Sequence, residues 1–329
     1  MIDECYAQQL DDALQFMKNG DNFLIVSHVQ PDGDAISSTV VVAWMLEKLG
    51  KRAVLVNEGE LPARLQYLDG FERIVSYKAT PLEQLYDCVI AVDCADFRRI
   101  GEVANSFAPN AQLLNIDHHP TNNEFGTVNI VYSKAAATVE ILYEMIQKAE
   151  MTLDTKCAEA IYTGLLTDTG GFRYSNTSAR VMEIASELLA AGVNGNRLAD
   201  HLLEKMTMGK LKLLQLSLSR LTFNNENTIG WVYIGKDDIV NSGGVPEDLE
   251  GIVNYALNVD GVEVGILFKE TKDGAVKVSL RSAGKADVAA IAQTFGGGGH
   301  VRAAGLRLED DMPTAINRVV EAVRKALEQ

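Results

Sequence analysis

The sequence is poor in cysteine and lacks a long apolar segment. Its four cysteines show no CxxC spacing, so neither a zinc site nor a disulfide framework is indicated. The longest apolar runs, such as residues 40–46, are much shorter than the roughly 20 residues that cross a bilayer. The N-terminus carries acidic residues where a secretory signal would be positively charged. We therefore expect a soluble, cytoplasmic protein with no membrane partner.

Basic residues are outnumbered as well. The chain has 30 Lys and Arg against 45 Asp and Glu, a net charge of −15. Residues 1–209 hold a net −13 of this charge and residues 210–329 only −2. Proteins bind long nucleic acids largely by neutralising phosphates with Lys and Arg. This composition therefore argues against a long nucleic acid as partner.

The first half of the chain alternates short apolar runs with helical patterns. The apolar runs are continuous, which is typical of parallel strands covered on both faces; they lie at 23–27, 52–56, 87–92, 112–116 and 127–131. A helix is predicted from about Ala35 to Leu49. Residues 135–206 are predicted to be helical, with Asp154, Ser178 and Asn194 as N-caps.

The second half has a different pattern. Strands are predicted at 221–223, 228–234, 262–268 and 275–280, with a hairpin turn at 272–274 and helices at 247–257, 287–295 and 313–327. A length of 329 residues also favours two domains. We predict an α/β fold with an N-terminal parallel-sheet domain (1–190) with helices on both faces, a helical linker (191–212) and a smaller α/β domain (213–329).

Histidine and aspartate gather where the predicted strands end. His28, Asp32 and Asp34 follow the first strand, Asp93 follows the strand at 87–92, and Asp117, His118 and His119 follow the strand at 112–116; Asp168 ends a helical stretch. Ligands bind at the carboxyl ends of strands in open parallel sheets. So many carboxylates would repel one another without a cation, and their mixture with imidazole suits a divalent ion such as manganese.

Two metal ions explain this residue set better than one, because four or more carboxylates would saturate a single ion. Two ions about 3.5–4 Å apart are suited to hydrolysis at phosphorus by a water that both activate. Asp93, on a central strand, is the candidate bridging ligand. Taken singly, Asp34 could cap the helix at Ala35, and His118 and His119 could be surface residues. Such coincidences at consecutive strand ends are improbable.

A second candidate site lies near the C-terminus, where four glycines precede His300 and Arg302. Ordering four glycines is costly, and their unobstructed N–H groups can form an anion nest. Arg281 and Ser282, at the end of a predicted strand, could add donors. The alternative interpretation is a flexible hinge.

These motifs resemble the DHH family of phosphoesterases. The segments His28–Asp34, Val92–Asp93, Asp117–His119 and Asp168 are similar to the four motifs of that family. Residues 297–305 are similar to the signature of the DHH-associated C-terminal domain. The similarity covers nearly the whole chain. Its two-domain size resembles family members that act as oligoribonucleases and pAp phosphatases (nanoRNases).

The resemblance implies a role for each motif residue and an active site in the cleft between the domains. It implies one metal on His28 and Asp32, a second on Asp34, His118 and Asp168, and Asp93 between them. It further implies that Asp117 supports the neighbouring imidazoles, and that His119 contacts the scissile phosphate and helps to protonate the leaving group. The implied binding residues for the substrate's other phosphate are Arg281, Ser282, Gly297, Gly298, Gly299 and His300; Arg302 joins them as a candidate donor beside the glycine run. Manganese is the implied metal.

The function expected from all this is the degradation of short oligoribonucleotides, of about two to five residues, to mononucleotides, together with dephosphorylation of pAp to AMP. A phosphodiesterase for cyclic di-AMP or linear pApA is the alternative, and a non-catalytic nucleotide-binding regulator fits less well. A manganese pyrophosphatase would carry other C-terminal residues, and a processive exonuclease would need a basic groove. A homodimer is compatible with the sequence.

Overall fold

The computed structural model describes residues 4–328. The chain divides into two compact units, Met1–Lys205 and Met206–Gln329. The division falls inside the stretch 191–212, for which the sequence predicts a helical linker. No helix among the described residues combines the length and apolarity that a membrane span requires.

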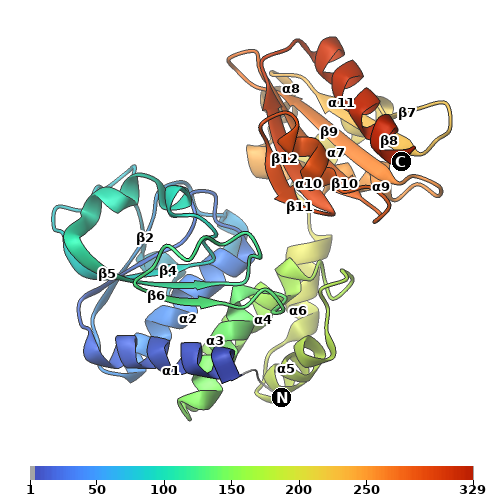
Figure 1. Ribbon diagram of the computed structural model, residues 1–329. Coiled ribbons are helices and arrows are strands. Elements are labelled where there is room, and N and C mark those ends of the chain that lie inside the picture. The colour runs from blue at the N-terminus through green and yellow to red at the C-terminus, as the bar shows by residue number, and fades with distance from the viewer. Residues whose placement is uncertain (1–3, 329) are drawn as a thin grey trace. The chain divides into compact units, whose positions relative to one another are not determined.

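The first unit is built on a six-stranded parallel sheet (Figure 1). Its strand order is β3-β2-β1-β4-β5-β6. The strands are β1 (Phe23–Val26), β2 (Ala53–Asn57), β3 (Ile74–Ser76), β4 (Tyr86–Val92), β5 (Phe107–Asp117) and β6 (Val128–Val131). The helices are α1 (Glu4–Asn19), α2 (Gly33–Lys48), α3 (Thr138–Lys148), α4 (Thr155–Asp168), α5 (Ala179–Ala190) and α6 (Gly195–Ala199). Short 3-10 helices are η1 (Ala63–Leu65), η2 (Phe71–Arg73) and η3 (Phe97–Ser106), and a π-helical turn is η4 (Asp200–Glu204).

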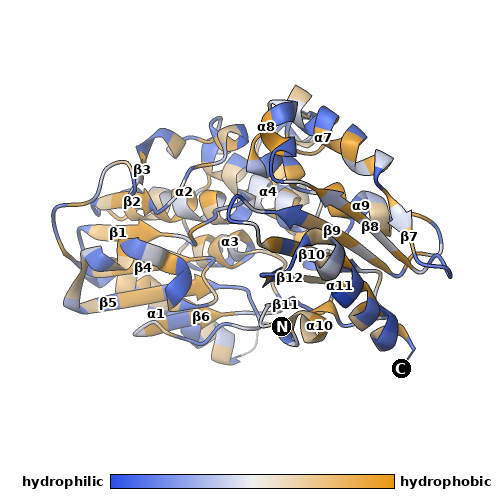
Figure 2. Ribbon diagram, turned by 90° about the horizontal axis from the view of Figure 1, so that it is seen from above, coloured by the Kyte–Doolittle hydropathy of each residue, from blue (hydrophilic) through white to orange (hydrophobic). Residues whose placement is uncertain are grey.

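The two faces of this sheet are covered unequally. Alternate strand residues such as Ile25 and Ile90 pack in one large core with helices α1 to α5. On the other face Leu24 and Val89 pack with Ile100 and Val103 of η3. Apolar side chains dominate the strands (Figure 2) because both faces are buried. This arrangement leaves the carboxyl ends of the strands as the place where polar side chains can gather.

The second unit contains a mixed six-stranded sheet in the order β11-β12-β10-β9-β8-β7. Its strands are β7 (Thr222–Phe223), β8 (Ile229–Ile234), β9 (Val264–Glu270), β10 (Val276–Ser282), β11 (Gly298–His300) and β12 (Ala303–Leu308). Its helices are α7 (Met208–Ser219), α8 (Asp238–Ser242), α9 (Ile252–Leu257), α10 (Val288–Gln293), α11 (Met312–Leu327) and the 3-10 helix η5 (Pro246–Leu249). The two-domain α/β fold predicted from the sequence is therefore confirmed.

Three local features differ from the predictions or the alternatives drawn from the sequence. The helix predicted at 247–257 is two pieces, because Gly251 has a left-handed φ of 80° between η5 and α9. The alternative interpretation of Asp34 as the cap of α2 does not hold, because Asp32 caps this helix: its carboxylate accepts the N–H groups of Asp34 and Ala35, both at 3.1 Å. The glycine run, interpreted from the sequence as an anion nest or a flexible hinge, contains the strand β11, which pairs with β12.

Candidate active site

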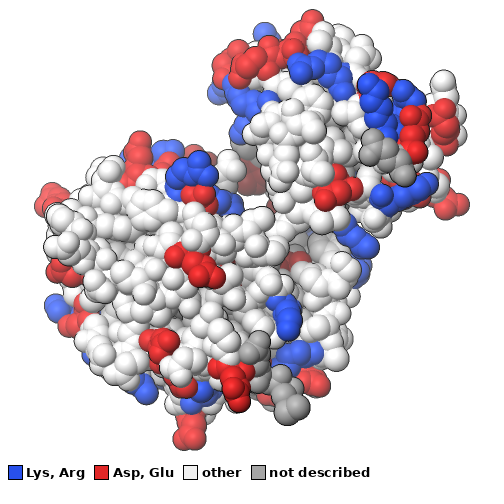
Figure 3. Space-filling model, in the orientation of Figure 1, with Lys and Arg blue, Asp and Glu red and all other residues white. Residues whose placement is uncertain are grey.

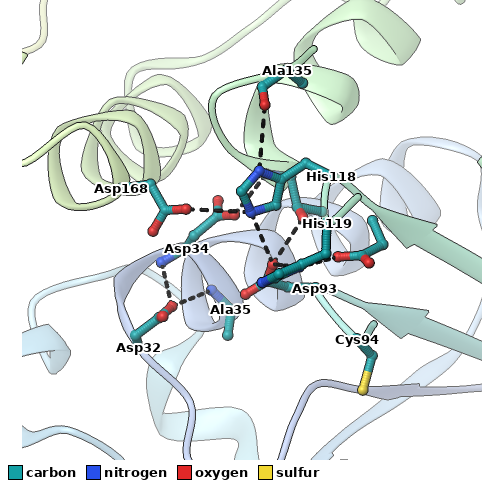
Figure 4. A network of polar contacts seen from close by, with 12 residues as sticks. Asp32, Asp34, Ala35, Asp93, Cys94, His118, His119, Ala135 and Asp168 are labelled. Carbon is teal, nitrogen blue, oxygen red and sulfur yellow. Dashed lines mark hydrogen bonds and ion pairs between the residues drawn. The ribbon is translucent and has the colours of Figure 1, made fainter. Parts of the chain in front are cut away.

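The predicted residues of the first unit meet at one edge of the parallel sheet (Figure 4). His28 and Asp93 follow the adjacent strands β1 and β4, and Asp117 ends the next strand, β5. His118 and His119 come directly after β5, Asp32 and Asp34 lie at the start of α2, and Asp168 ends α4. Three strand ends and two helix ends thus bring these side chains together.

Asp93 lies at the centre of the group. Its carboxylate oxygens are 3.4 Å from His28 Nε2, 3.6 Å from His118 Nε2 and 3.6 Å from His119 Nδ1. The residue is 2% exposed and has a φ of 55°. A left-handed backbone costs a non-glycine residue about 1–2 kcal/mol. The strained backbone therefore occurs at the residue whose carboxylate lies among three imidazoles.

Three overlapping sets of side chains have ligand atoms within 4.8 Å of one another and could hold metal ions. The sets are His28–Asp32–Asp93, Asp93–His118–His119 and Asp34–His118–Asp168. Asp93 and His118 each belong to two sets. His118 Nε2 is also 3.4 Å from Asp168 Oδ2. Asp93 thus links the first set to the second, and His118 links the second set to the third.

The first turn of α3 holds Asp34. The backbone N–H groups of Thr138 and Val139 donate to its two carboxylate oxygens at 2.6 and 3.1 Å. Ala137, the N-cap residue of α3, makes no side-chain cap of its own. Asp34, from 104 residues earlier, therefore caps this helix and is favoured there by the positive end of the helix dipole. The Thr138 hydroxyl donates to Asp93 Oδ1 at 3.0 Å, so one residue supports two carboxylates.

A second network lies behind His119. Its Nδ1 is 2.7 Å from Asp117 Oδ1, and the Asn122 amide donates to Asp117 Oδ2 at the same distance. Asp117 is fully buried. Sequence reasoning singled out neither Thr138 nor Asn122, because nothing distinguishes a lone Thr at a helix start or a lone Asn in a polar loop. Their partners become visible only when the strands are assembled.

Three carboxylates of the site, those of Asp34, Asp93 and Asp168, have shifted pKa values. Burial, and then the charges of Asp93 and Asp32, raise the pKa of Asp34 well above its usual value. Burial, and then the charge of Asp34, likewise raise the pKa of Asp168. Burial opposes ionisation of Asp93, yet its hydrogen bond to His28 and the electrostatic interaction with His28, His119 and His118 lower its pKa. Burial alone would lower the pKa of His119, but the hydrogen bond to Asp117 raises it to about 9.

The second unit brings together two of its predicted binding residues. Arg281 on β10 and His300 on β11 both pair with Ala303 of β12, and paired residues point to the same side of an antiparallel sheet. Ser282 is 5% exposed, and its hydroxyl accepts the Gly284 N–H at 3.0 Å, so this side chain already serves a local turn. Arg302 is exposed, as are Gly298 and Gly299, while Gly297 is half-buried. Arg281 and His300 thus share one row across a small central residue.

Comparison with known proteins identifies the family to which the chain belongs. The model of the DHH family, N-terminal domain, matches residues 22–165, and the model of the DHHA1 domain matches residues 235–329. The "Bifunctional oligoribonuclease and PAP phosphatase NrnA" of Thermus thermophilus is 34% identical over 92% of this chain and 89% of its own length. The chain belongs to the DHH family. The resemblance inferred from the motifs is therefore confirmed.

Two further proteins are similar to this chain, one in structure and one in sequence. A crystal structure of an exopolyphosphatase-related protein from Bacteroides fragilis is 26% identical, with a TM-score of 0.87 over 98% of this chain and 96% of that one. The "Cyclic-di-AMP phosphodiesterase PdeA" of Listeria monocytogenes is 25% identical over 92% of this chain but only 47% of its own length. The fold is shared over 98% of this chain, whereas the match to the second relative covers less than half of that protein's length.

Proposed function

We propose that this protein is a metal-dependent phosphoesterase that degrades short oligoribonucleotides to mononucleotides and removes the 3′-phosphate from pAp. The three overlapping ligand sets at one edge of the sheet carry the proposal. The activities named for the Thermus thermophilus relative support the choice of substrates. The substrate length of about two to five residues remains part of the proposal, as does a cytoplasmic location.

The side chains fit two divalent cations. Among the described residues, no Lys or Arg nitrogen lies within 4.0 Å of the carboxylates of Asp34, Asp93, Asp117 and Asp168. These carboxylates therefore have no Lys or Arg partner in the described part of the chain, and the imidazole and carboxylate donors of the cluster suit an ion such as Mn²⁺. We assign His28 and Asp32 to one ion, Asp34, His118 and Asp168 to the other, and Asp93 to both.

Bound divalent ions would activate a water and stabilise the negative charge that develops on phosphate oxygens. The remaining residues of the proposed site bind and orient the substrate. Asp117 engages Nδ1 of His119, so we assign the opposite ring nitrogen, Nε2, to the scissile phosphate and to protonation of the leaving group. In the second unit we assign Arg281, His300, Arg302, Ser282 and residues 297–299 to the substrate's second phosphate or terminal nucleotide. The row shared by Arg281 and His300 supports this assignment.

A panel of substrates tests the proposal. Turnover of pAp, a ribonucleotide dimer, a ribonucleotide 24-mer and cyclic di-AMP is compared with Mn²⁺, with Ca²⁺ and with EDTA. We expect rapid hydrolysis of the dimer and pAp with Mn²⁺, slow hydrolysis of the 24-mer, and none with EDTA. Preference for cyclic di-AMP would favour the activity named for the Listeria monocytogenes relative. Binding without turnover of any substrate would favour a regulatory protein.

A further inference from the structure

Asn122 occupies an unusual place in the loop that follows β5. Its amide contacts the ends of two neighbouring strands, β4 and β5, as well as its own loop. The nitrogen donates to Asp117 Oδ2 at 2.7 Å and to the Cys94 carbonyl at 3.1 Å. The oxygen accepts the Glu124 backbone N–H at 2.7 Å and the Asn115 side-chain amide at 3.2 Å. Both donors and both acceptor positions of this side chain are therefore used.

The backbone partners decide which way the amide points. A backbone N–H can only donate, so the atom facing Glu124 is the oxygen. A carbonyl can only accept, so the atom facing Cys94 is the nitrogen. The same nitrogen is thereby directed at Asp117. The orientation of the Asn122 donor follows from main-chain contacts and does not depend on the protonation of any side chain.

This donor fixes the rotation of the Asp117 carboxylate. One of its oxygens binds His119 and the other binds Asn122, each at 2.7 Å. Because Asp117 is fully buried, removal of the Asn122 donor would leave Oδ2 without this partner where water is excluded. The carboxylate could then turn away from His119. The ring would lose the contact that sets both its orientation and the nitrogen that carries its proton.

The Asn122 side chain also binds the segment that follows β4. Asp93 holds a left-handed backbone, and the next residue, Cys94, is the carbonyl partner of Asn122. A backbone hydrogen bond from Asn123 to the carbonyl of Ala95, at 3.2 Å, extends this contact between the two loops. The loop that orients His119 is thus tied directly to the loop that carries Asp93.

We infer that Asn122 is a positioning residue for the reaction: through Asp117 it holds the His119 ring toward the leaving group, and through Cys94 it keeps that ring in register with Asp93. The inference rests on the proposed role of His119. It goes beyond the proposed function because it assigns a residue outside the four motifs. It also predicts which step of the reaction depends on that residue.

Steady-state kinetics of three variants test the inference. Asn122→Ala removes all four contacts, whereas Asn122→Asp keeps the shape but places an acceptor where the donor was. Asn123→Ala is the matched control, because this neighbouring side chain is exposed and only its backbone takes part in the contact between the loops. For a ribonucleotide dimer we expect kcat to fall about 10- to 100-fold in both Asn122 variants. We expect KM to change little and the control to match the wild type.

A substrate with a good leaving group separates positioning from general damage. The p-nitrophenyl ester of a nucleoside 5′-phosphate releases p-nitrophenolate, which needs no proton from the enzyme. If Asn122 acts through His119, the Asn122 variants should lose no more than about threefold in kcat on this ester, because general acid catalysis no longer contributes. Equal losses on the ester and on the dimer would overturn the inference, as would an Asn123→Ala variant as impaired as Asn122→Ala.

Nuclear magnetic resonance of metal-free protein provides a readout that needs no turnover. With ¹⁵N-labelled histidine, the His119 ring is identified by the signals missing from a His119→Gln variant. We expect a slowly exchanging Nδ1–H proton in the wild type and in Asn123→Ala, and its loss in both Asn122 variants. Persistence of that proton in the Asn122 variants would overturn the inference. Should the wild type hydrolyse none of the substrates, the proposed function fails, and this measurement still decides the role of Asn122.

Discussion

Single carboxylates in this site take up roles that differ because their partners differ. Asp93 faces three imidazole nitrogens within 3.6 Å, while Asp34 is held by two backbone N–H groups at the start of α3. Asp32 uses one oxygen to cap α2, and its other oxygen lies 4.0 Å from His28 Nε2. Each carboxylate is oriented by the protein before any cation binds. That preorganisation makes the roles of individual residues separable by mutation.

Asp93→Asn should nearly abolish turnover while leaving the fold intact. Asparagine tolerates the left-handed φ of 55° and keeps the side-chain shape, but it cannot bridge two cations as a carboxylate does. We expect a rate loss of well over tenfold, which is more than about 1.4 kcal/mol of activation free energy. Steady-state kinetics and the melting temperature of the metal-free variant check this. A folded variant that keeps more than about a tenth of the wild-type rate would contradict the bridging role.

Thr138→Val should weaken metal binding without unfolding the chain. The substitution removes the hydroxyl that donates to Asp93 but preserves the backbone N–H that binds Asp34. Loss of a group that orients a ligand typically lowers metal affinity about 10- to 100-fold. Calorimetric titration with Mn²⁺ measures the effect, and Thr138→Ser, which keeps the hydroxyl, should restore most of the affinity. Equal Mn²⁺ affinity in wild type and Thr138→Val would remove Thr138 from the metal site.

At the scale of helices and strands, the glycines of the run in the second unit differ in whether their position has room for a side chain. A Cβ at Gly299, where φ is 144°, would lie 2.4 Å from the Ala303 carbonyl oxygen. A Cβ at Gly297 would lie 2.3 Å from the Gly305 carbonyl oxygen. At Gly298 a Cβ would meet nothing within 4 Å. Strand pairing therefore requires glycine at 297 and 299, but not at 298.

Gly298→Ala and Gly299→Ala should consequently behave differently. We expect Gly299→Ala to destabilise the protein by about 1–3 kcal/mol, since β11 must shift away from β12. Gly298→Ala should leave the free energy of unfolding within about 0.5 kcal/mol of wild type. It should nevertheless raise KM several-fold, because its methyl group obstructs the approach of a phosphate. Denaturant unfolding and KM values for pAp test both. An unchanged KM in Gly298→Ala would argue against a phosphate site at this strand.

The same scale shows what the sequence could predict. The caps Asp154, Ser178 and Asn194 are confirmed because an N-cap depends on residues two or three positions away. The strand ends that bear the site were predictable for the same local reason. The pairing of β11 with β12 was not, since glycines carry no alternation of apolar side chains. The contact of Asp34 with Thr138 joins residues 104 positions apart and required the assembled fold.

For the whole molecule, charge is distributed by unit. The first unit holds most of the net charge of −15, while the second is nearly neutral. On the face drawn in Figure 3, Lys and Arg are denser on the second unit, where acidic residues accompany them. Two divalent ions would cancel only about four negative charges. Phosphates beyond the two proposed binding points would therefore meet net repulsion.

Substrate length should accordingly bring no advantage. We expect kcat/KM to be highest for ribonucleotides of about two to five residues and to fall as chains lengthen, with a shallow salt dependence because few phosphates are neutralised. A series from dimer to 24-mer at two salt concentrations measures this. Efficiency that rises with length, or a steep salt slope, would instead indicate a processive exonuclease.

The central claim is that the strand-end cluster of the first unit holds two divalent cations. Equilibrium dialysis of metal-free protein against Mn²⁺, with metal analysis of the dialysed sample, tests it directly. We expect two ions per chain in the wild type and fewer than two in Asp93→Asn. The melting temperature should rise as the ions bind, because a ligand at 100 times its Kd stabilises the folded state by about 2.7 kcal/mol. A wild-type protein that binds one ion or none at saturating Mn²⁺ would contradict the account.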